Sequence, residues 1–256
     1  MTEIVQTLSY IFGLTIIRYI VIAGVAFLLF YFLLAKKFLN SKIQTRPLKK
    51  KNIVREILHS CQSAIVFTVI TFIILFTPLK NYTLIYDSIG EYSYWWIGIS
   101  TLLALIIHDT YFYWMHRSLH HKKIYKYTHV VHHKSTNPSP WASYSFHVLE
   151  AIAEGLILVV IVFMLPLHIV SISLFTVVGL IINVYGHLGY EIAPKAFRST
   201  ILFKFLNTSV HHNMHHSRFN GNYGLYFRIW DRLMKTEVSD YEKQYDIIQE
   251  KRFGKQ

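Results

Sequence analysis

The feature that most limits the possible folds of this chain is a series of apolar runs of membrane-spanning length. A helix needs about 20 mostly apolar residues to cross the hydrocarbon core of a bilayer. Five segments are candidates for such a helix, namely residues 10–35, 57–79, 94–115, 146–165 and 167–185. The runs predict an all-α integral membrane bundle of about four or five transmembrane helices. The first is too long for a signal peptide and lacks its cleavage pattern, so we expect a retained anchor.

Composition supports a membrane protein and argues against a nucleic-acid-binding one. Charged residues make up 16% of the chain, whereas they make up about a quarter of ordinary soluble proteins. The single cysteine, Cys61, excludes an internal disulfide framework and a cysteine-rich zinc module. The net charge of +12 comes with no recognisable module for reading nucleic acid, so we expect no nucleic-acid partner.

The basic residues indicate the orientation in the membrane. Eight of them follow the first apolar run with no acidic residue among them: Lys36, Lys37, Lys42, Arg46, Lys49, Lys50, Lys51 and Arg55. The positive-inside rule places such a loop in the cytoplasm. Alternate crossings then bring the ends of the third and fifth runs back to the cytoplasmic face. Arg18, within the first run, is expected to extend toward the nearer interface.

Fourteen of the fifteen histidines lie between His108 and His216, and most form tight groups at helical spacing. The groups are His116 with His120; His129, His132 and His133; His187, with Asn183 four residues earlier; and His212, His215 and His216, with His211 beside them. Residues i, i+3 and i+4 share one face of a helix, so each group directs its imidazoles to one point. In the third run, Asp109 and Tyr113 fall on the same stripe as His116 and His120.

So many imidazoles predict two metal ions. Neutral imidazole binds iron, zinc, copper and nickel. One metal takes about four to six ligands, so eight or nine histidines imply two metals. A chemistry that would require such a centre is attack on an unactivated C–H bond. It needs an oxidant that side chains cannot supply, and therefore a redox metal and dioxygen. The isolated His59 and His168 are expected to be structural, and His108 lies off the stripe and is expected not to be a ligand.

Two other classes of protein use histidines in membranes. A metal transporter places ionisable ligands near the middle of its spans, whereas these histidines gather at helix ends. A membrane zinc hydrolase uses three protein ligands and one open position, which is fewer than the histidines present. Metal analysis would distinguish these two classes from an enzyme that uses dioxygen. Two irons per chain would indicate such an oxygenase, one zinc the hydrolase, and weakly held, exchangeable metal the transporter.

The motifs that contain these histidines also resemble a known family. They are HDTYFYWMHRSLH (108–120), HVVHH (129–133), NVYGHLGYE (183–191), HHNMHH (211–216) and GNYGLYFRIWDRL (221–233). Across residues 95–237 the chain resembles the fatty acid hydroxylase and sterol desaturase superfamily of histidine-box di-iron oxygenases. The resemblance implies O2-dependent hydroxylation or desaturation of a membrane lipid, of sterol or fatty acyl type, in lipid biosynthesis.

The resemblance also implies an architecture and a ligand set. It predicts a cytoplasmic helical cap over the membrane helices, holding two iron ions that zinc or another divalent metal can replace in a purified sample. The implied ligands are His116, His120, His129, His132, His133, His187, His212, His215 and His216. Asn183 stands where some members have a histidine, which leaves the tenth ligand open.

Four carboxylates are candidates to orient the imidazoles, as partners of ligand histidines commonly do. They are Asp109, Glu150, Asp231 and Glu191, and the first three join Asn183 as candidate catalytic-site residues. On the fourth run, Glu150 and Glu154 share a face, and charge within a membrane segment indicates a functional or paired role.

Electrons for the reaction must come from another protein. The chain has no dinucleotide fingerprint and no cysteine set for an iron–sulfur cluster. We therefore expect a ferredoxin or a cytochrome b5-like donor to dock on the basic cytoplasmic face. The sequence divides into N-terminal membrane helices with the basic cytoplasmic loop (1–93), a histidine-box catalytic domain with a membrane hairpin (94–240) and a C-terminal tail (241–256).

Overall fold

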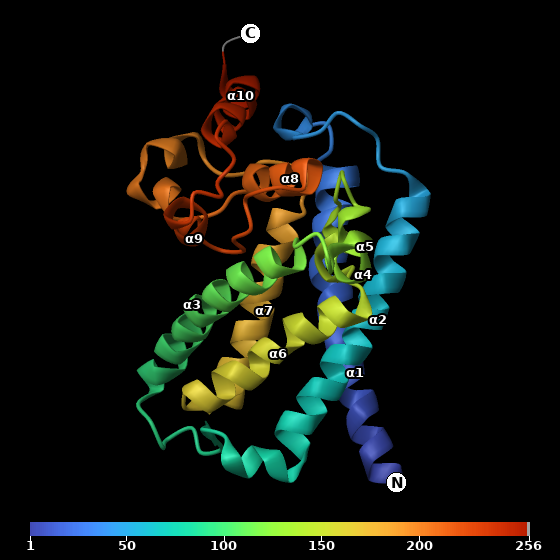
Figure 1. Ribbon diagram of the computed structural model, residues 1–256, viewed down its shortest axis with the longest axis vertical. Coiled ribbons are helices and arrows are strands. Elements are labelled where there is room, and N and C mark those ends of the chain that lie inside the picture. The colour runs from blue at the N-terminus through green and yellow to red at the C-terminus, as the bar shows by residue number, and fades with distance from the viewer. Residues whose placement is uncertain (255–256) are drawn as a thin grey trace.

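The computed structural model describes residues 1–254 and confirms the all-α class. Five long helices form the body of the molecule (Figure 1). They are α1 (Thr2–Leu28, continued by a π-helix, Leu29–Leu33), α2 (Lys50–Phe76), α3 (Tyr94–Leu119), α6 (Val148–Met164) and α7 (Ile169–Gly186). The N-terminus lies at one end of this bundle, and the last residues that the structure describes lie beyond the other (Figure 1).

Four helices in the described part of the chain are long and apolar enough to cross a membrane. They are Thr2–Leu33, Lys50–Phe76, Tyr94–Leu119 and Ile169–Gly186. Helix α6 has 17 residues and is therefore about 26 Å long at 1.5 Å per residue, slightly short of the ~30 Å hydrocarbon core. The five predicted runs thus become four helices of spanning length and one shorter helix, which packs against α2 and α3. The chain is an integral membrane protein.

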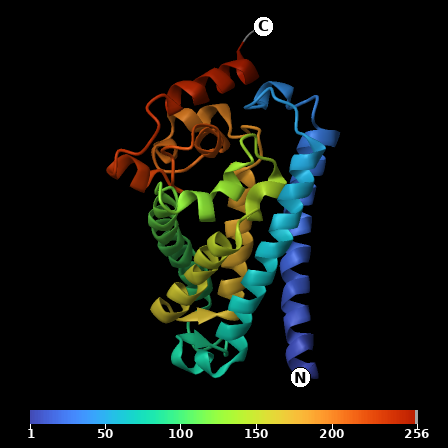
Figure 2. The ribbon, with the colours of Figure 1, turned by 45° about the vertical axis from the view of Figure 1, so that its right-hand side comes forward.

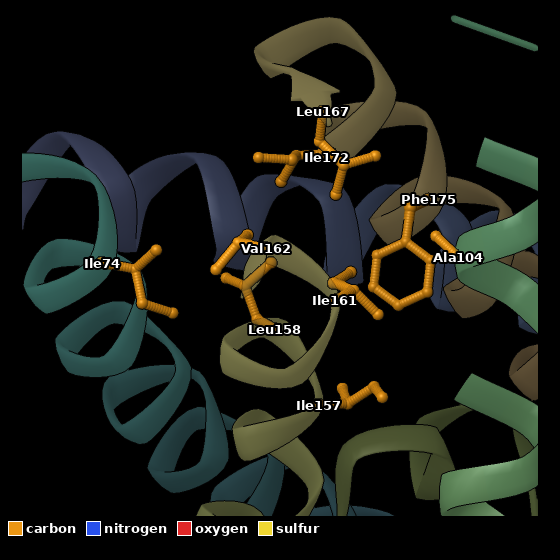
Figure 3. Packing of buried hydrophobic residues seen from close by; sticks show 9 residues of the cluster. All are labelled: Ile74, Ala104, Ile157, Leu158, Ile161, Val162, Leu167, Ile172 and Phe175. Carbon is orange, nitrogen blue, oxygen red and sulfur yellow. The ribbon is translucent and has the colours of Figure 1, made fainter. Parts of the chain in front are cut away.

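The buried face of α6 forms the centre of the bundle. Ile161 and Val162 are fully buried there, and Leu158 is nearly so. They meet Ile74 of α2 and Phe175 of α7 in one apolar cluster (Figure 3). Because neighbouring helices cover this face of α6, side-chain packing holds the helix in the bundle.

The connection between α6 and α7 is a tight hairpin with a feature that the sequence analysis did not predict. Residues Leu167–His168 form strand β2, which pairs in parallel with strand β1, Ile85–Tyr86. This small sheet lies at the end of the bundle away from the C-terminus (Figure 2). It ties the α6–α7 hairpin to the segment between α2 and α3.

Short helices gather at the opposite end of the bundle and form a cap (Figures 1 and 2). The α-helices there are α4 (Tyr125–Thr128), α5 (Val130–His133), α8 (Ser209–Arg218), α9 (Ile229–Leu233) and α10 (Tyr241–Phe253). The 3-10 helices of the chain are Leu39–Ser41, Pro78–Tyr82, Pro140–Tyr144, Lys195–Ser199 and Ile201–Lys204.

The segment expected to be a C-terminal tail is an ordered part of this cap. Tyr241, Tyr245 and Ile248 of α10 are buried against an apolar cluster that includes Phe203 and Met214. Their spacing of four and then three residues places them on one helix face. Residues 255–256 lie outside the described residues, and the three-part division of the chain stays a prediction.

Arg18 lies differently from the expectation. Its Nη1 donates a hydrogen bond to Thr176 Oγ1 on α7 at 2.8 Å, and the side chain is half-buried between helices. The hydroxyl on α7 accepts this hydrogen bond, which holds the guanidinium group against the bundle.

A buried ion pair joins the segments of the cap. Arg228 is fully buried, and its Nε and Nη2 donate to the two carboxylate oxygens of Glu237 at 2.6 and 2.9 Å. Nη1 donates to the carbonyl of Phe203. Removing one partner of a buried pair leaves an uncompensated charge, which destabilises a fold strongly.

We therefore expect Arg228→Met to lower the free energy of unfolding. The loss should lie toward the lower end of about 3–5 kcal/mol, because the Glu237 side chain is 20% exposed. Arg232→Met, at an exposed position of the same segment, should change it by no more than about 0.5 kcal/mol. Denaturant unfolding of both variants in detergent measures the difference, and equal losses would contradict the role assigned to Arg228.

Candidate metal centre

The fold brings all nine predicted histidine ligands together in two groups. One group contains His116, His120, His129, His133 and His215. The other contains His132, His187, His212 and His216. Within each group, the nitrogens available to a metal lie within 4.8 Å of one another. We call them the five-histidine group and the four-histidine group.

The histidines converge because several helices end at the same level under the cap. His116 lies in the last turn of α3, His120 caps that helix, and His187 caps α7. The short helices α4 and α5 bring the second histidine motif, and α8 brings the last. Eight consecutive residues of α8, Ser209–His216, are buried, so this helix contacts protein on every side.

A sharp turn after α8 completes the wall of the five-histidine group. Phe219 has a left-handed backbone, and Gly221 has a φ of +84°. A Cβ atom at Gly221 would lie 2.4 Å from the carbonyl oxygen of Thr236, so only glycine fits. The turn directs the carbonyl of Gly221 at His215 Nδ1, 2.8 Å away.

The spacing of ring nitrogens suits a metal in each group. In the five-histidine group, Nε2 of His116 lies 2.9 Å from Nε2 of His129, and the Nε2 atoms of His120 and His133 are 3.0 Å apart. In the four-histidine group, the Nε2 atoms of His187, His212 and His216 are mutually 3.1 Å apart. Two nitrogens bound to one metal at about 2.0–2.1 Å lie roughly 3.0–3.4 Å apart.

The two groups lie side by side, with rings of one against rings of the other, as a dinuclear centre requires. The ring centroids of His133 and His216, from different groups, are 5.0 Å apart. Those of His132 and His216, within the four-histidine group, are 4.6 Å apart. Adjacent residues of one motif therefore serve different groups, since His132 belongs to one and His133 to the other.

The surroundings fix the tautomer of several imidazoles. A carbonyl or a carboxylate only accepts, so a ring Nδ1 that faces one must carry the hydrogen, and Nε2 is left with its lone pair for a metal. Four such bonds are His116 to Tyr223 O (2.9 Å), His187 to Asn183 O (2.8 Å), His215 to Gly221 O (2.8 Å) and His129 to Glu150 Oε1 (2.6 Å).

Burial keeps the imidazoles neutral. It lowers the pKa values of the cap histidines well below the ordinary value, and the neighbouring imidazoles mostly add to that effect. This applies to His129, His132, His133, His212, His215 and His216. His215 Nε2 is also buried without a hydrogen-bond partner. Neutral, unpartnered nitrogens are the donors that a transition metal needs, so the residues fit the implied metals.

The carboxylates take different positions around the two groups. Within residues 1–254, Glu150 is the one of the four that contacts a predicted ligand directly, through His129 Nδ1. Asp109 instead accepts from the backbone N–H groups of Tyr226 and Phe227 at 2.7 and 3.1 Å. It fixes the loop beside α3, and its role in orienting a histidine stays a prediction.

Asp231 and Glu191 likewise hold backbone segments. Asp231 accepts from the N–H groups of Tyr223 and Gly224 at 2.9 and 2.7 Å, and the carbonyl of Tyr223 is the acceptor for His116. Glu191 accepts from the N–H of Val210 at 3.3 Å, which links the end of α7 to α8. Burial raises the pKa of both carboxyl groups above the ordinary value, and the hydrogen bonds that they accept offset only part of this rise.

Asn183 lies beside the four-histidine group on its membrane side. Its side-chain N–H donates to the carbonyl of Ser143 at 2.8 Å. With His132 and His187, it lines a cavity of about 10 Å³, roughly the space that one water needs. The role of Asn183 as a weak or open coordination position stays a prediction.

Sequence reasoning missed the backbone acceptors of this site. The carbonyls of Gly221 and Tyr223 lie in the GNYG segment, whose glycines are the available signal. His108 lies outside both groups and pairs with the hydroxyl of Tyr226 at 2.9 Å. His211 is also outside them, buried 4.0 Å from Asp231.

Comparison with known proteins identifies the family of the chain. A model of the fatty acid hydroxylase family matches residues 101–236. Lathosterol oxidase of Rattus norvegicus is 32% identical over 231 residues, which cover 89% of this chain and 74% of the relative. A Delta(7)-sterol 5(6)-desaturase of Gibberella zeae is 30% identical over 219 residues, covering 83% and 66%. No solved structure matches the chain significantly. The chain belongs to the fatty acid hydroxylase family.

Proposed function

We propose that the chain is an oxidoreductase that hydroxylates or desaturates a membrane lipid with O2, using two irons held by the nine histidines. The observation that supports this most is the pair of adjacent histidine groups at one end of a membrane bundle. The relatives named above are a lathosterol oxidase and a sterol desaturase, which favours a sterol-like lipid. The family is that of the fatty acid hydroxylases, which favours an acyl lipid.

The residues of the chain would divide the work around the metals. Two irons supply the means of activating O2 for attack on a C–H bond. The nine imidazoles hold them, and Glu150 with the carbonyls of Tyr223, Gly221 and Asn183 keeps four of these rings oriented. The cap buries the histidines and so excludes bulk water from them, which protects a reactive centre from side reactions.

We further propose that the cap and its metals lie in the cytoplasm and that an acidic electron carrier docks there. The loop between α1 and α2 is basic and lies at the cap end of the bundle (Figure 1). Exposed Lys122, Lys123 and Lys126 lie between His120 and His129, two of the predicted ligands. Opposite charges steer association, so a ferredoxin or a cytochrome b5-like protein suits this surface.

Metal content tests the centre. We expect purified protein to hold two metals per chain and His132→Ala to lose at least one metal and all turnover, because His132 belongs to the smaller group. His121→Ala is the matched control, since His121 is exposed and lies outside both groups. Elemental analysis with a turnover assay measures both. Retention of both metals and activity by the His132 variant would remove that histidine motif from the ligand set.

Asn183 and His187 should differ in their hold on metal. An amide oxygen is a poorer ligand for iron than imidazole, so Asn183→Ala should keep both metals and lower the rate. His187→Ala should loosen or strip one metal. Elemental analysis and turnover are measured on the same samples. Equal loss of metal would make Asn183 a full ligand, and no change in metal or rate would leave it a packing residue.

Cysteine labelling tests the orientation. In a Cys61→Ser background, cysteines at the exposed positions Lys49 and Lys251 should react with an impermeant reagent only from the cytoplasmic side. A cysteine at exposed Asn81, in the connection between α2 and α3, should react from the other side. Labelling of positions 49 and 251 from opposite sides would reject the proposed topology.

A further inference from the structure

Four aromatic side chains, which we call the aromatic row, lead from the five-histidine group to the surface of the chain. The ring of Tyr223 comes first, with its centroid 5.1 Å from that of His120. Tyr113 follows at 6.3 Å from Tyr223, and Trp230 stacks on Tyr113 at 5.9 Å. Trp114 comes last, 5.5 Å from Trp230. Centroid separations of about 4.5–7 Å are those of aromatic rings in contact, so each ring of the row touches the next.

The aromatic row runs from the interior of the protein to its surface. Tyr223 and Tyr113 are buried, whereas Trp114, near the cap end of α3, is 41% exposed. The indole N–H of Trp230 donates to Thr110 Oγ1 of α3 at 3.1 Å, which holds that ring in place. Phenol and indole are among the side-chain groups that give up one electron most readily. Phenylalanine would fill the same space without that property, so the composition of the row indicates electron transfer in addition to packing.

The hydroxyl group of Tyr113 has a route for its proton. It lies 2.9 Å from Thr236 Oγ1, which in turn lies 2.7 Å from Asp231 Oδ1. A carboxylate only accepts, so the hydroxyl of Thr236 donates to Asp231 and accepts the hydrogen of Tyr113. Arg117 Nη1 donates to the Tyr113 oxygen at 3.2 Å. The hydrogen bonds therefore all run in one direction, from the phenol to the carboxylate.

A buried phenol needs such a route before it can lose an electron. Removing one electron from a phenol makes its O–H group strongly acidic, and a positively charged ring beside the guanidinium of Arg117 is unfavourable. The proton must therefore leave with the electron. Burial raises the pKa of the Asp231 carboxyl group above its ordinary value, so its carboxylate is a better proton acceptor than an exposed one. Tyr113 thus has a neighbouring ring for the electron and an acceptor for the proton.

We propose that Tyr113 is a redox-active residue and that the aromatic row carries oxidising equivalents from the metal centre to the surface when no substrate takes them. The inference rests on the proposed function, because the bound metals and O2 supply the oxidant. An oxidant strong enough to attack a C–H bond also attacks imidazole. A route that removes such equivalents therefore protects the nine histidines.

The transfer balances in electrons and protons. One electron passes from Tyr113 through Tyr223 toward the metals, and the phenolic O–H bond of Tyr113 breaks. The proton moves to Thr236 as Thr236 passes its own proton to Asp231. An electron from the tryptophans then restores Tyr113, the proton returns by the same path, and a one-electron reductant in solution, such as ascorbate, fills the vacancy at Trp114. With hydrogen peroxide as the oxidant, two such transfers and two protons from solvent break its O–O bond and form two water molecules.

Electron paramagnetic resonance tests the proposal without a turnover assay. Iron-loaded protein in detergent, free of lipid substrate, is mixed with hydrogen peroxide and frozen, and ring-deuterated tyrosine identifies a tyrosyl radical by narrowing its signal. We expect this radical in the wild type and its loss in Tyr113→Phe, which keeps the ring and removes the O–H group. Tyr125→Phe is the matched control and should keep the signal, since Tyr125 lies 5.4 Å from His120 but outside the row.

Thr236 separates a redox role of Tyr113 from a packing role. Thr236→Val leaves Tyr113 in place but removes its proton acceptor, so it should lose the radical signal, whereas Thr236→Ser keeps the hydroxyl group and should retain the signal. These two variants also test the proposal if Tyr113→Phe does not fold.

Peptide mass spectrometry provides a second measurement at the far end of the row. After longer exposure to hydrogen peroxide, we expect oxygen to be added at Trp114 more than at Trp95, and Tyr113→Phe or added ascorbate should suppress this addition. Trp95 is the matched control because it is 83% exposed and lies at the other end of α3. Greater exposure alone would favour its oxidation.

Three results would overturn the inference. They are an unchanged tyrosyl signal in Tyr113→Phe, an unchanged signal in Thr236→Val, and equal oxidation of Trp95 and Trp114 without any tyrosyl radical in wild-type protein that holds two irons. Each of them leaves the proposed function standing, because elemental analysis of the same samples reports the metals. Protein that holds no metal would instead reject the proposed function and the inference together.

Discussion

The constraint on which this structure depends is the convergence of nine neutral imidazoles with their nitrogens about 3 Å apart. A buried acceptor without a donor costs about 1–3 kcal/mol, so such a cluster is unfavourable unless a cation binds it or the scaffold enforces it. The chain enforces it from outside the cluster. Carbonyls and one carboxylate take the Nδ1 hydrogens of four rings, so their Nε2 atoms face one another.

Membrane helices provide the rigidity that this arrangement needs. Helices α3 and α7 end at the level of the cluster, so His116 and His187 are placed by elements whose backbone bonds are satisfied within the bilayer. The remaining histidines come from short helices that a bundle alone would not fix. Glu191 holds α8 by accepting the N–H of Val210. Asp109 and Asp231 hold the loop at residues 223–227, and the carbonyl of Tyr223 in that loop faces His116. The acidic residues around the site thus act mainly on the backbone.

Much of this was predictable from the sequence, and the rest fails for identifiable reasons. Apolar length predicted five spanning runs, of which four are helices of spanning length and α6 is shorter. Histidine spacing predicted the nine residues of the two groups, but it did not predict that a single motif divides between them, as His132 and His133 do. Spacing reports which residues share a face, but not which carbonyl of a distant loop meets them, so Gly221 and Tyr223 were missed. The burial of α10 rests on contacts with Phe203 and Met214, far away in sequence. Arg18 was misplaced because its acceptor, Thr176, lies on another helix.

The shorter helix α6 connects the metal centre to the membrane interior. At its start, Glu150 orients His129, and one turn later Glu154 lines a cavity of the membrane bundle that reaches Arg18. Beyond that turn the buried face of α6 becomes wholly apolar, with Ile157, Ile161 and Val162 in the core. Within about three turns, this one helix contributes the carboxylate beside His129, then a wall of the cavity, and then the packed core. Because Glu150 and Glu154 are on one rigid element, this cavity and the histidines keep a fixed relation.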